Sequence, residues 1–399
     1  MGQHFEKQVL LSQIFQPSTM QIKPFKALFA KTNLLGSATE FCENAKISFQ
    51  KNLESGLFEH HEADCFFVYQ IDNGLNKHIG LVGLNHVNDF LEGRIKKHED
   101  TLSDRELEQK EVFLRLKAIL KPILVTHAPV PVLTTWLNQY AHAHIPLLSA
   151  QFTKGTSVHR FWAVSQADDI ALLQSIFAQH ITETYIADGH HRTTTTALLH
   201  LDPEFRTSGL DLSQLFCAWF ASDQLKILDY NRVVEGVKKI GQAKLMALLS
   251  KIFVIDILEK PQKPQQKHEL VMCLGKDWYT LRWHDFVLEL APNGYDTLDT
   301  DLLNRLVINK IFEIIDVRND TRITYVDGGK GLDGLKKVVR HHRTDRVGFA
   351  FFPVAFEDLT RMADAGENLP PKSTYFEPRM KSGLLVRSLE KLEPNTTTR

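Results

Sequence analysis

The sequence predicts a mixed α/β protein whose core is followed by a second, smaller α+β unit. Short apolar runs of strand length alternate with longer stretches of helical period up to about residue 228. The chain has 399 residues, more than one domain usually contains. The pattern then changes to clustered strands around a polar, proline-containing loop. The predicted parts are a flexible arm at 1–20, an α/β core at 21–228, an α+β accessory domain at 229–345, and a segment at 346–399 that returns to the core cleft and ends in a disordered tail.

Composition excludes several classes of protein. An apolar content of 43% and a charged content of 24% are typical of an ordinary soluble globular protein. The net charge of −1 does not favour nucleic acid or an anionic membrane as a partner. No apolar run reaches the ~18 residues of a membrane span, and the N-terminus lacks a signal-peptide core, so we expect a cytoplasmic protein. The four cysteines form no CxxC pair, which argues against a disulfide framework.

Hydrophobic periodicity places the elements of the core. The expected strands are 65–71, 78–86, 123–126, 157–164, 181–186 and 216–222. The expected helices are 38–57, 104–120, 133–142 and 167–180. In the second part we expect helices at 233–252, 299–315 and 330–341, and strands at 270–274, 278–283 and 286–290. A strand at 346–354 and a helix at 356–365 follow.

The segment Tyr185-Ile-Ala-Asp-Gly-His-His-Arg192 is the most informative part of the chain. Its apolar, β-branched approach predicts a buried strand, and Asp188-Gly189 predicts a turn in which the glycine can take a positive φ. Helical spacing follows and ends at Asp202-Pro203. A strand, a glycine turn and a helix start together aim backbone N–H groups and the positive end of the helix dipole at an anion.

Polar side chains open the helix after this turn. Arg192 offers a guanidinium fork suited to phosphate or carboxylate, and His190 and His191 can exchange protons. The threonines at 193–196 are poor helix formers, so we expect some of their hydroxyls to serve as donors. The alternative is a surface turn with two solvated histidines, which would not need a buried strand before it.

A second polar segment lies near the C-terminus. Lys372, Ser373 and Thr374 present a cation and two hydroxyls in a loop stiffened by Pro370-Pro371. We expect this loop to return to the cleft of the Asp-Gly turn and close over phosphates. The alternative is a solvated, proline-stiffened loop.

Four motifs resemble those of the bacterial and archaeal family called domain of unknown function 1015. They occur in that family's order and span about residues 20 to 388. Thr193 departs from the family pattern, in which an aromatic residue follows the arginine, so a base-stacking role is in doubt there. The motifs are Ile22-Lys-Pro-Phe25, Lys97-His-Glu-Asp-Thr101, Ile186-Ala-Asp-Gly-His-His-Arg192 and the segment from Ala363-Asp-Ala-Gly366 to Leu369-Pro-Pro-Lys-Ser-Thr-Tyr-Phe376.

The Asp-Gly-His-His-Arg turn also resembles the ParB/sulfiredoxin-like superfamily, which includes free-serine kinases. This second resemblance implies a ParB/sulfiredoxin-like catalytic core. It further implies a nucleotide-dependent phosphotransferase (kinase) that acts on a small hydroxylated metabolite, with ATP or ADP and Mg²⁺ as cofactors. Glu99 is then the candidate general base, as an upstream acidic residue is in those kinases, and His98 would orient the substrate. Without the resemblance, Glu99 reads as a surface residue before a helix.

The candidate site residues follow from these roles. They are, for catalysis, Glu99, His98, Asp188, His190 and His191; for phosphate binding, Gly189, Arg192, Lys372, Ser373 and Thr374; and for the metal ion, Asp188.

Two other functions stay open. A non-catalytic nucleotide-binding or regulatory protein would use the same turn without turnover. A metal-dependent hydrolase would take Asp188, His190 and His191 as ligands, although adjacent histidines rarely reach one metal and no HExxH motif is present. DNA binding is not favoured, because the sequence has no basic domain and no clear helix-turn-helix. The expected partners are a small-molecule substrate and a nucleotide, without membrane or nucleic acid, and the oligomeric state is left open.

Overall fold

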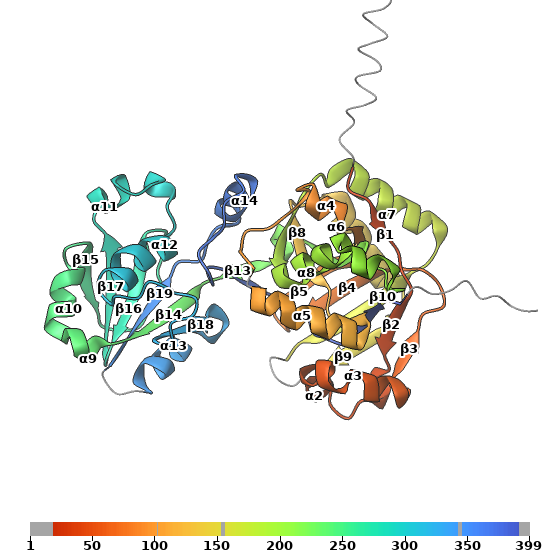
Figure 1. The fold of residues 1–399 in the computed structure, drawn as a ribbon, viewed down its shortest axis with the longest axis horizontal. Helices are drawn as coiled ribbons and strands as arrows, with labels where there is room; N and C mark the ends of the chain where they lie inside the picture. Colours follow the sequence, from red (N-terminus) through yellow and green to blue (C-terminus); the bar gives the residue numbers. More distant parts are fainter. Residues whose placement is uncertain (1–18, 102, 153–155, 342–344, 391–399) are drawn as a thin grey trace, which may run out of the picture. The chain divides into compact units, whose positions relative to one another are not determined.

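The computed structural model describes residues 19–101, 103–152, 156–341 and 345–390. They divide into two compact units (Figure 1). The first contains the described residues within Met1–Lys97, Thr101–Leu225 and Pro378–Arg399, and the second contains His98–Asp100 and Lys226–Glu377. Most of the predicted arm at 1–20 and of the predicted tail lies outside the described residues.

A nine-stranded sheet is the centre of the first unit. Its order is β6-β11-β8-β12-β5-β4-β10-β9, with β1 beside β5. β8 runs parallel to β12 and antiparallel to β11, so the start of β8 lies beside the end of β11. The strands are β1 (Ile22–Lys23), β4 (Phe66–Asp72), β5 (Lys77–His86), β6 (Ile95–Lys96), β8 (Ile123–His127), β9 (Leu148–Gln151), β10 (Val158–Val164), β11 (Thr184–Asp188) and β12 (Gln214–Ala221).

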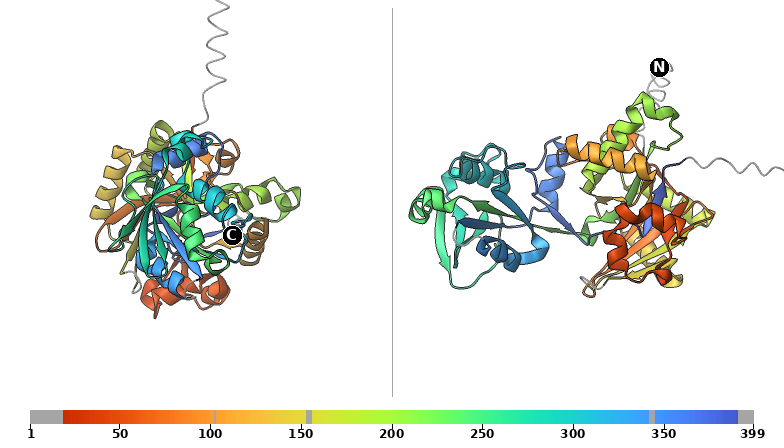
Figure 2. Two further views of the ribbon diagram at one scale, coloured as in Figure 1. Left: turned by 90° about the vertical axis from the view of Figure 1, so that its left-hand side faces the viewer. Right: turned by 60° about the horizontal axis from the view of Figure 1, so that its bottom comes forward.

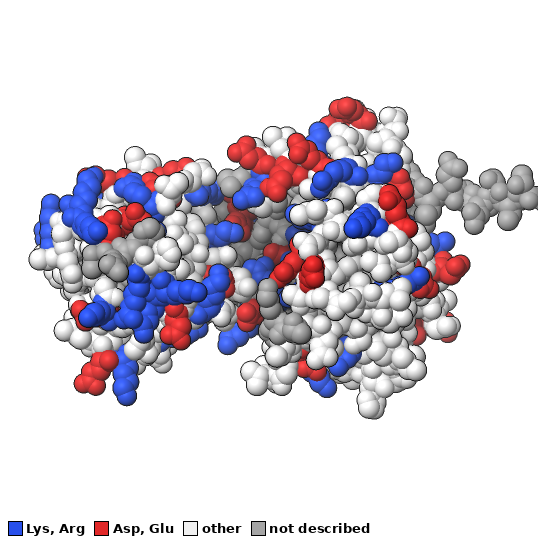
Figure 3. Space-filling view, turned by 90° about the horizontal axis from the view of Figure 1, so that it is seen from below, with Lys and Arg blue, Asp and Glu red and all other residues white. Residues whose placement is uncertain are grey.

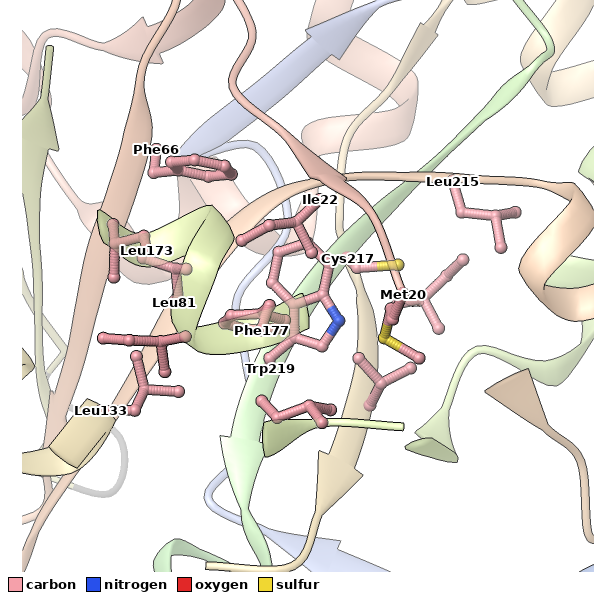
Figure 4. Close-up of a cluster of buried hydrophobic side chains, with 14 of the residues drawn as sticks. Met20, Ile22, Phe66, Leu81, Leu133, Leu173, Phe177, Leu215, Cys217 and Trp219 are labelled. Atoms are coloured by element: carbon pink, nitrogen blue, oxygen red, sulfur yellow. The ribbon is translucent and has the colours of Figure 1, made fainter. Parts of the chain in front are cut away.

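Helices pack against this sheet and complete its core. They are α4 (Asn88–Leu91), α6 (Pro131–Ala143), α7 (Ala167–His180) and α8 (His190–Leu201), and α5 (Ser103–Leu116) packs on α8. Figure 4 shows Leu133 of α6 and Phe177 of α7 in one buried cluster with Trp219 of β12. The rings of Phe177 and Trp219 meet edge to face with centroids 5.2 Å apart. Burial of each such side chain contributes roughly 1.5–3 kcal/mol to folding.

A smaller, four-stranded sheet completes the first unit. Its order is β3-β2-β21-β7, so the C-terminal strand β21 lies between two strands from the N-terminal third of the chain. Helices α2 (Ala38–Glu43) and α3 (Ala45–Glu54) accompany it, and Phe49 of α3 packs on Phe58. The strands are β2 (Ala27–Ala30), β3 (Phe58–His60), β7 (Ala118–Ile119) and β21 (Leu385–Ser388).

The second unit is built on an antiparallel six-stranded sheet of order β15-β17-β16-β19-β14-β18, visible in the left panel of Figure 2. The strands are β14 (Tyr230–Glu235), β15 (Phe253–Leu258), β16 (Glu269–Leu274), β17 (Asp277–Trp283), β18 (Ile323–Asp327) and β19 (Arg346–Phe351). The helices are α9 (Val237–Ile240), α10 (Gln242–Leu249), α11 (Asp285–Glu289), α12 (Asp299–Leu303) with a π-helical turn at Asn304–Asn309, α13 (Gly331–Arg340) and α14 (Phe356–Asp364). A separate antiparallel pair joins β13 (Lys226–Leu228) to β20 (Tyr375–Glu377).

The mixed α/β class predicted from the sequence is confirmed, but two elements of the second unit were predicted wrongly. The expected helix 233–252 begins instead as strand β14, because Val233 and Val234 are β-branched and pack within the sheet. Gly236 and Gly241, at φ of +122° and +86°, then divide the remainder into α9 and α10. The expected strand 286–290 is helix α11.

The C-terminal part also returns later than expected. Strand β19 pairs with β14 and β16 inside the second unit, so the segment that rejoins the first unit begins at Pro378 and not at residue 346. Both signs of charge occur on the visible face of each unit (Figure 3). In the described ranges, every helix is too short or too polar to cross a membrane.

Candidate anion site

The strand–turn–helix segment predicted from the sequence is present in the first unit. β11 ends at Asp188, after a bulge between Ile186 and Asp188, and α8 begins at His190. A bulge of this kind re-aims the side chains around it. Gly189 caps the helix at a φ of +111°, which L-residues rarely adopt. A Cβ atom at Gly189 would lie 2.7 Å from Nη2 of Arg192, so the absence of a side chain at this position leaves room for the guanidinium.

Three cations converge on the carboxylate of Asp188. Nζ of Lys121 lies 2.8 Å from Oδ2, and Nη2 of Arg192 lies 3.2 Å from the same oxygen. Nη1 of Arg379 donates to Oδ1 at 3.0 Å. Nη2 of Arg192 also donates to the carbonyl of Pro122 at 3.3 Å. Three cations and one carboxylate therefore meet at the positive end of α8.

The topology explains why these residues meet. Because β8 runs antiparallel to β11, Lys121 and Pro122, which precede β8, stand beside Asp188 at the end of β11. Arg192 follows one turn into α8, and Arg379 arrives at the start of the returning C-terminal segment. Sequence reasoning missed Lys121 and Arg379, because their approach depends on strand pairing and chain return. The position of Lys121 immediately before a predicted strand was the only signal for it.

The electrostatics of the cluster keep Asp188 ionised. Burial by itself would raise the pKa of Asp188, but Lys121, Arg192 and Arg379 hold that pKa well below its usual range. Burial lowers the pKa of Lys121, and Asp188 opposes that shift. Asp188 therefore acts as an anionic centre that holds three cations in place.

These surroundings do not fit a magnesium ion at Asp188. Both carboxylate oxygens already accept hydrogen bonds from cations, and those cations would repel a divalent ion. Within the described part of the chain, no three or more His, Cys, Asp or Glu side chains group as they would around a metal ion.

Three of the four threonines in α8 have structural roles. Thr193 donates to the carbonyl of Gly189 at 3.1 Å, Thr196 to that of Arg192 at 2.8 Å, and Thr195 to that of Glu106 at 3.4 Å. All three side chains are buried. The sequence predicted that some of these hydroxyls serve as donors, and these three donate to backbone carbonyls. Of the two histidines, His190 is buried and His191 half-buried in the first turn of α8.

The other candidate residues belong to the second unit. His98 is buried, and burial lowers its pKa from 6.5 to about 4. Its Nε2 lies 3.5 Å from Oγ1 of Thr374, and its carbonyl accepts from the amide of Leu369 at 2.7 Å. The structure thus brings the predicted base region and the predicted phosphate loop together inside one unit. Glu99 beside His98 is half-buried.

Within that loop, Lys372 is exposed and Ser373 is buried. Oγ of Ser373 donates to the carbonyl of Pro370 at 2.6 Å. The expectation that Lys372, Ser373 and Thr374 close over Asp188 to Arg192 joins residues of two units, and it stays a prediction.

Comparisons with known proteins give a family and distant structural likenesses. The model of the family described as "Protein of unknown function (DUF1015)" matches residues 29–302. No curated protein matches the sequence. Among solved structures, C-terminally truncated SbnI from Staphylococcus aureus is 13% identical with a TM-score of 0.38, and the match covers 74% of this chain and 82% of that one. A free serine kinase mutant in complex with ADP is 13% identical with a TM-score of 0.36, covering 74% and 87%. A conserved hypothetical protein from Pyrococcus furiosus is 14% identical with a TM-score of 0.35, covering 74% and 90%. Likenesses at these TM-scores carry no functional argument.

Proposed function

The chain belongs to the family described as Protein of unknown function (DUF1015), and for this member we propose a phosphorylated ligand, a nucleotide, bound at the first turn of α8. The observation that carries the proposal is the convergence of Lys121, Arg192 and Arg379 on the single carboxylate of Asp188. Three cations gathered within hydrogen-bond distance of one carboxylate form a setting that suits a phosphate group.

The donors of the site suit a phosphate. Among the described residues, Nε of Arg192 is buried and has no hydrogen-bond partner, so that N–H remains for a ligand. The first amides of α8 have no carbonyl partners within the helix, and they add donors and the helix dipole. Asp188 positions the cations, and we do not assign it a role in metal binding.

We extend the proposal to phosphoryl transfer to a small hydroxylated metabolite, with Glu99 as the general base. In that step the acceptor hydroxyl gives its proton to the Glu99 carboxylate, and its oxygen forms a bond to the terminal phosphorus of the nucleotide. The bond from that phosphorus to the bridging oxygen breaks, and the nucleoside diphosphate leaves. This role of Glu99 rests on the sequence, as does the role of His98 in orienting the substrate.

Calorimetry with ADP, ATP and inorganic phosphate tests the binding site. The change Arg192→Ala removes a charge-assisted contact of about 1.5–3 kcal/mol, so affinity should fall by roughly 10- to 100-fold. Arg105→Ala is the matched control, because Arg105 is an exposed arginine of the same unit that pairs with Glu108 on its own helix. Absence of phosphate binding by the wild type, or equal affinity in Arg192→Ala, would reject the site.

A second variant separates binding from turnover. Glu99→Gln preserves shape and removes proton acceptance, so nucleotide affinity should stay while turnover falls by roughly 10²–10⁴. Glu108→Gln, on the exposed face of α5, should change neither. Binding without phosphorylation of any acceptor would favour a non-catalytic nucleotide-binding protein. Activity that requires zinc and persists without nucleotide would favour a hydrolase.

A further inference from the structure

An arginine is completely buried in the second unit. Arg232 lies in β14, between Tyr325 of β18 and Phe349 of β19, and its exposed fraction is 0%. Its Cζ atom lies 5.7 Å from the centroid of the Tyr325 ring and 5.1 Å from that of Phe351. Nη2 donates to the carbonyl of Pro371 at 3.2 Å. Burial lowers the pKa of this guanidinium.

The charge of Arg232 has no acidic partner in the described part of the chain. No carboxylate there lies within 4.0 Å of it, and Nε and Nη1 have no hydrogen-bond partner of standard geometry. The hydroxyl of Tyr325 donates to the carbonyl of Val317 at 2.7 Å, and its oxygen is close enough to the guanidinium to favour the charged form. Asp301 is close enough to influence the guanidinium, but it is engaged by Arg305 at 2.8 Å. A buried charge without a partner is costly, and a protein retains one where it is used.

A second buried arginine shows the usual arrangement. Arg387 in β21 is 2% exposed. It pairs with the carboxylate of Asp211 at 2.8 Å and also donates to the carbonyls of Asp211 and Gln214. The contrast marks Arg232 as an arginine whose counter-ion is not part of the described chain.

The loop that contacts Arg232 carries further polar groups. After Pro371, whose carbonyl accepts from Arg232, Lys372 adopts a left-handed φ of +55°, a strained conformation for this residue. Oγ of Ser373 lies 3.1 Å from Oγ1 of Thr300, and both side chains are buried. A cavity of about 90 Å³ reaches Thr300 and Phe351, and the ion pair of Lys267 with Asp358 also lines it. Phe351 therefore contacts the guanidinium and also lines the cavity.

We propose that Arg232 anchors a second anion site, which lies within the second unit beneath the loop 370–374 and takes a compact oxyanion, either a carboxylate or a phosphate. Nε and Nη1 of Arg232 supply the buried donors, and the exposed Lys372, whose Nζ lies 5.6 Å from the centroid of the Tyr230 ring, supplies a second charge. Because Arg232 has no exposed surface, the loop must move for the ligand to enter. The site is independent of the one proposed at α8.

The test measures anion binding in a background that lacks the first site. The Arg192→Ala protein is titrated with inorganic phosphate and, separately, with acetate, and the shift of its melting temperature is recorded. We expect one of these anions to stabilise it. Adding Arg232→Met or Lys372→Ala should weaken that binding on the order of tenfold or more. Lys372 is exposed, so its variant is expected to fold. Stabilisation by inorganic phosphate would indicate a phosphate ligand, and stabilisation by acetate would indicate a carboxylate ligand.

Stability without ligand gives a second readout. Replacement of an unpaired buried charge by an apolar side chain of similar shape should raise the melting temperature in Arg232→Met. The matched change Arg387→Met should lower it, because the carboxylate of Asp211 loses its partner. The proposal is overturned if Arg192→Ala shows no response to either anion, or if its response is unchanged by Arg232→Met and Lys372→Ala. If the proposed site at α8 fails instead, Arg232→Met alone would abolish all anion binding, whereas Arg192→Ala would leave anion binding unchanged.

Discussion

Substitution of Gly189 by alanine separates the two demands on the turn before α8. The first demand is conformational, because Gly189 has a φ of +111°. A left-handed backbone costs an L-residue about 1–2 kcal/mol. The second is steric, because the new Cβ would lie 2.7 Å from Nη2 of Arg192. That distance is too short, so the guanidinium must move away from Asp188 and Pro122. Loss of those contacts adds about 1.5 kcal/mol, the lower end for charge-assisted bonds, because both contacts are longer than 3 Å.

Urea unfolding with a matched glycine measures these contributions. Gly209, in the same unit, has a φ of +75° and nothing within 4 Å of the position that an alanine methyl would take, so Gly209→Ala reports the conformational cost alone. We expect about 1–2 kcal/mol for Gly209→Ala and about 2.5–3.5 kcal/mol for Gly189→Ala. In an Arg192→Ala background, the cost of Gly189→Ala should fall to that of Gly209→Ala, which gives a coupling energy of about 1.5 kcal/mol. A coupling energy near zero would refute the steric argument.

Two further predictions concern the second unit. Burial lowers the pKa of His98 from 6.5 to about 4, so the unfolded chain binds a proton at this residue at a higher pH than the folded chain does. The free energy of unfolding therefore has its full value above pH 6.5 and decreases as the pH falls toward 4. This decrease amounts to about 3 kcal/mol. In His98→Gln, the free energy of unfolding measured in urea should change less between pH 6.5 and about pH 4. An unchanged pH dependence in the variant would contradict the lowered pKa of His98. Gly348→Ala would place a Cβ 2.7 Å from Val339 and 2.9 Å from Leu335, so overpacking should cost about 1–3 kcal/mol in the same assay. A cost below about 0.5 kcal/mol would contradict overpacking and show that α13 shifts to accommodate the methyl group.

Local rules predicted the parts of the fold that depend on neighbours in sequence. The helix expected at 167–180 is present as α7 with those bounds, and the strand, glycine turn and helix around Gly189 are present as β11 and α8. For α7 the hydrophobic period suffices, and for the segment around Gly189 the glycine adds the signal for a turn. The family expectation is confirmed by the match over residues 29–302.

The parts that were missed depend on tertiary partners. Val233 and Val234 fit a helical apolar pattern as well as a strand, and only the neighbouring strands β18 and β19 decide between them. Arg232 in the same strand carries no sign in the sequence that it is fully buried. Lys121 and Arg379 reach Asp188 from distant parts of the chain, and periodicity contains no information about such an approach.

Because the first unit is discontinuous in sequence, the order of translation affects which unit can be completed first on the ribosome. Its four-stranded sheet needs β21, and its charge cluster needs Arg379, both of which are translated after the whole second unit. The second unit enters and leaves through β13 and β20, whose end residues Lys226 and Glu377 are paired. The second unit can therefore be completed on the nascent chain before strand β21 of the first unit has been translated. Domains usually mature from the N-terminus onward, whereas this connectivity lets the second unit be completed before the first.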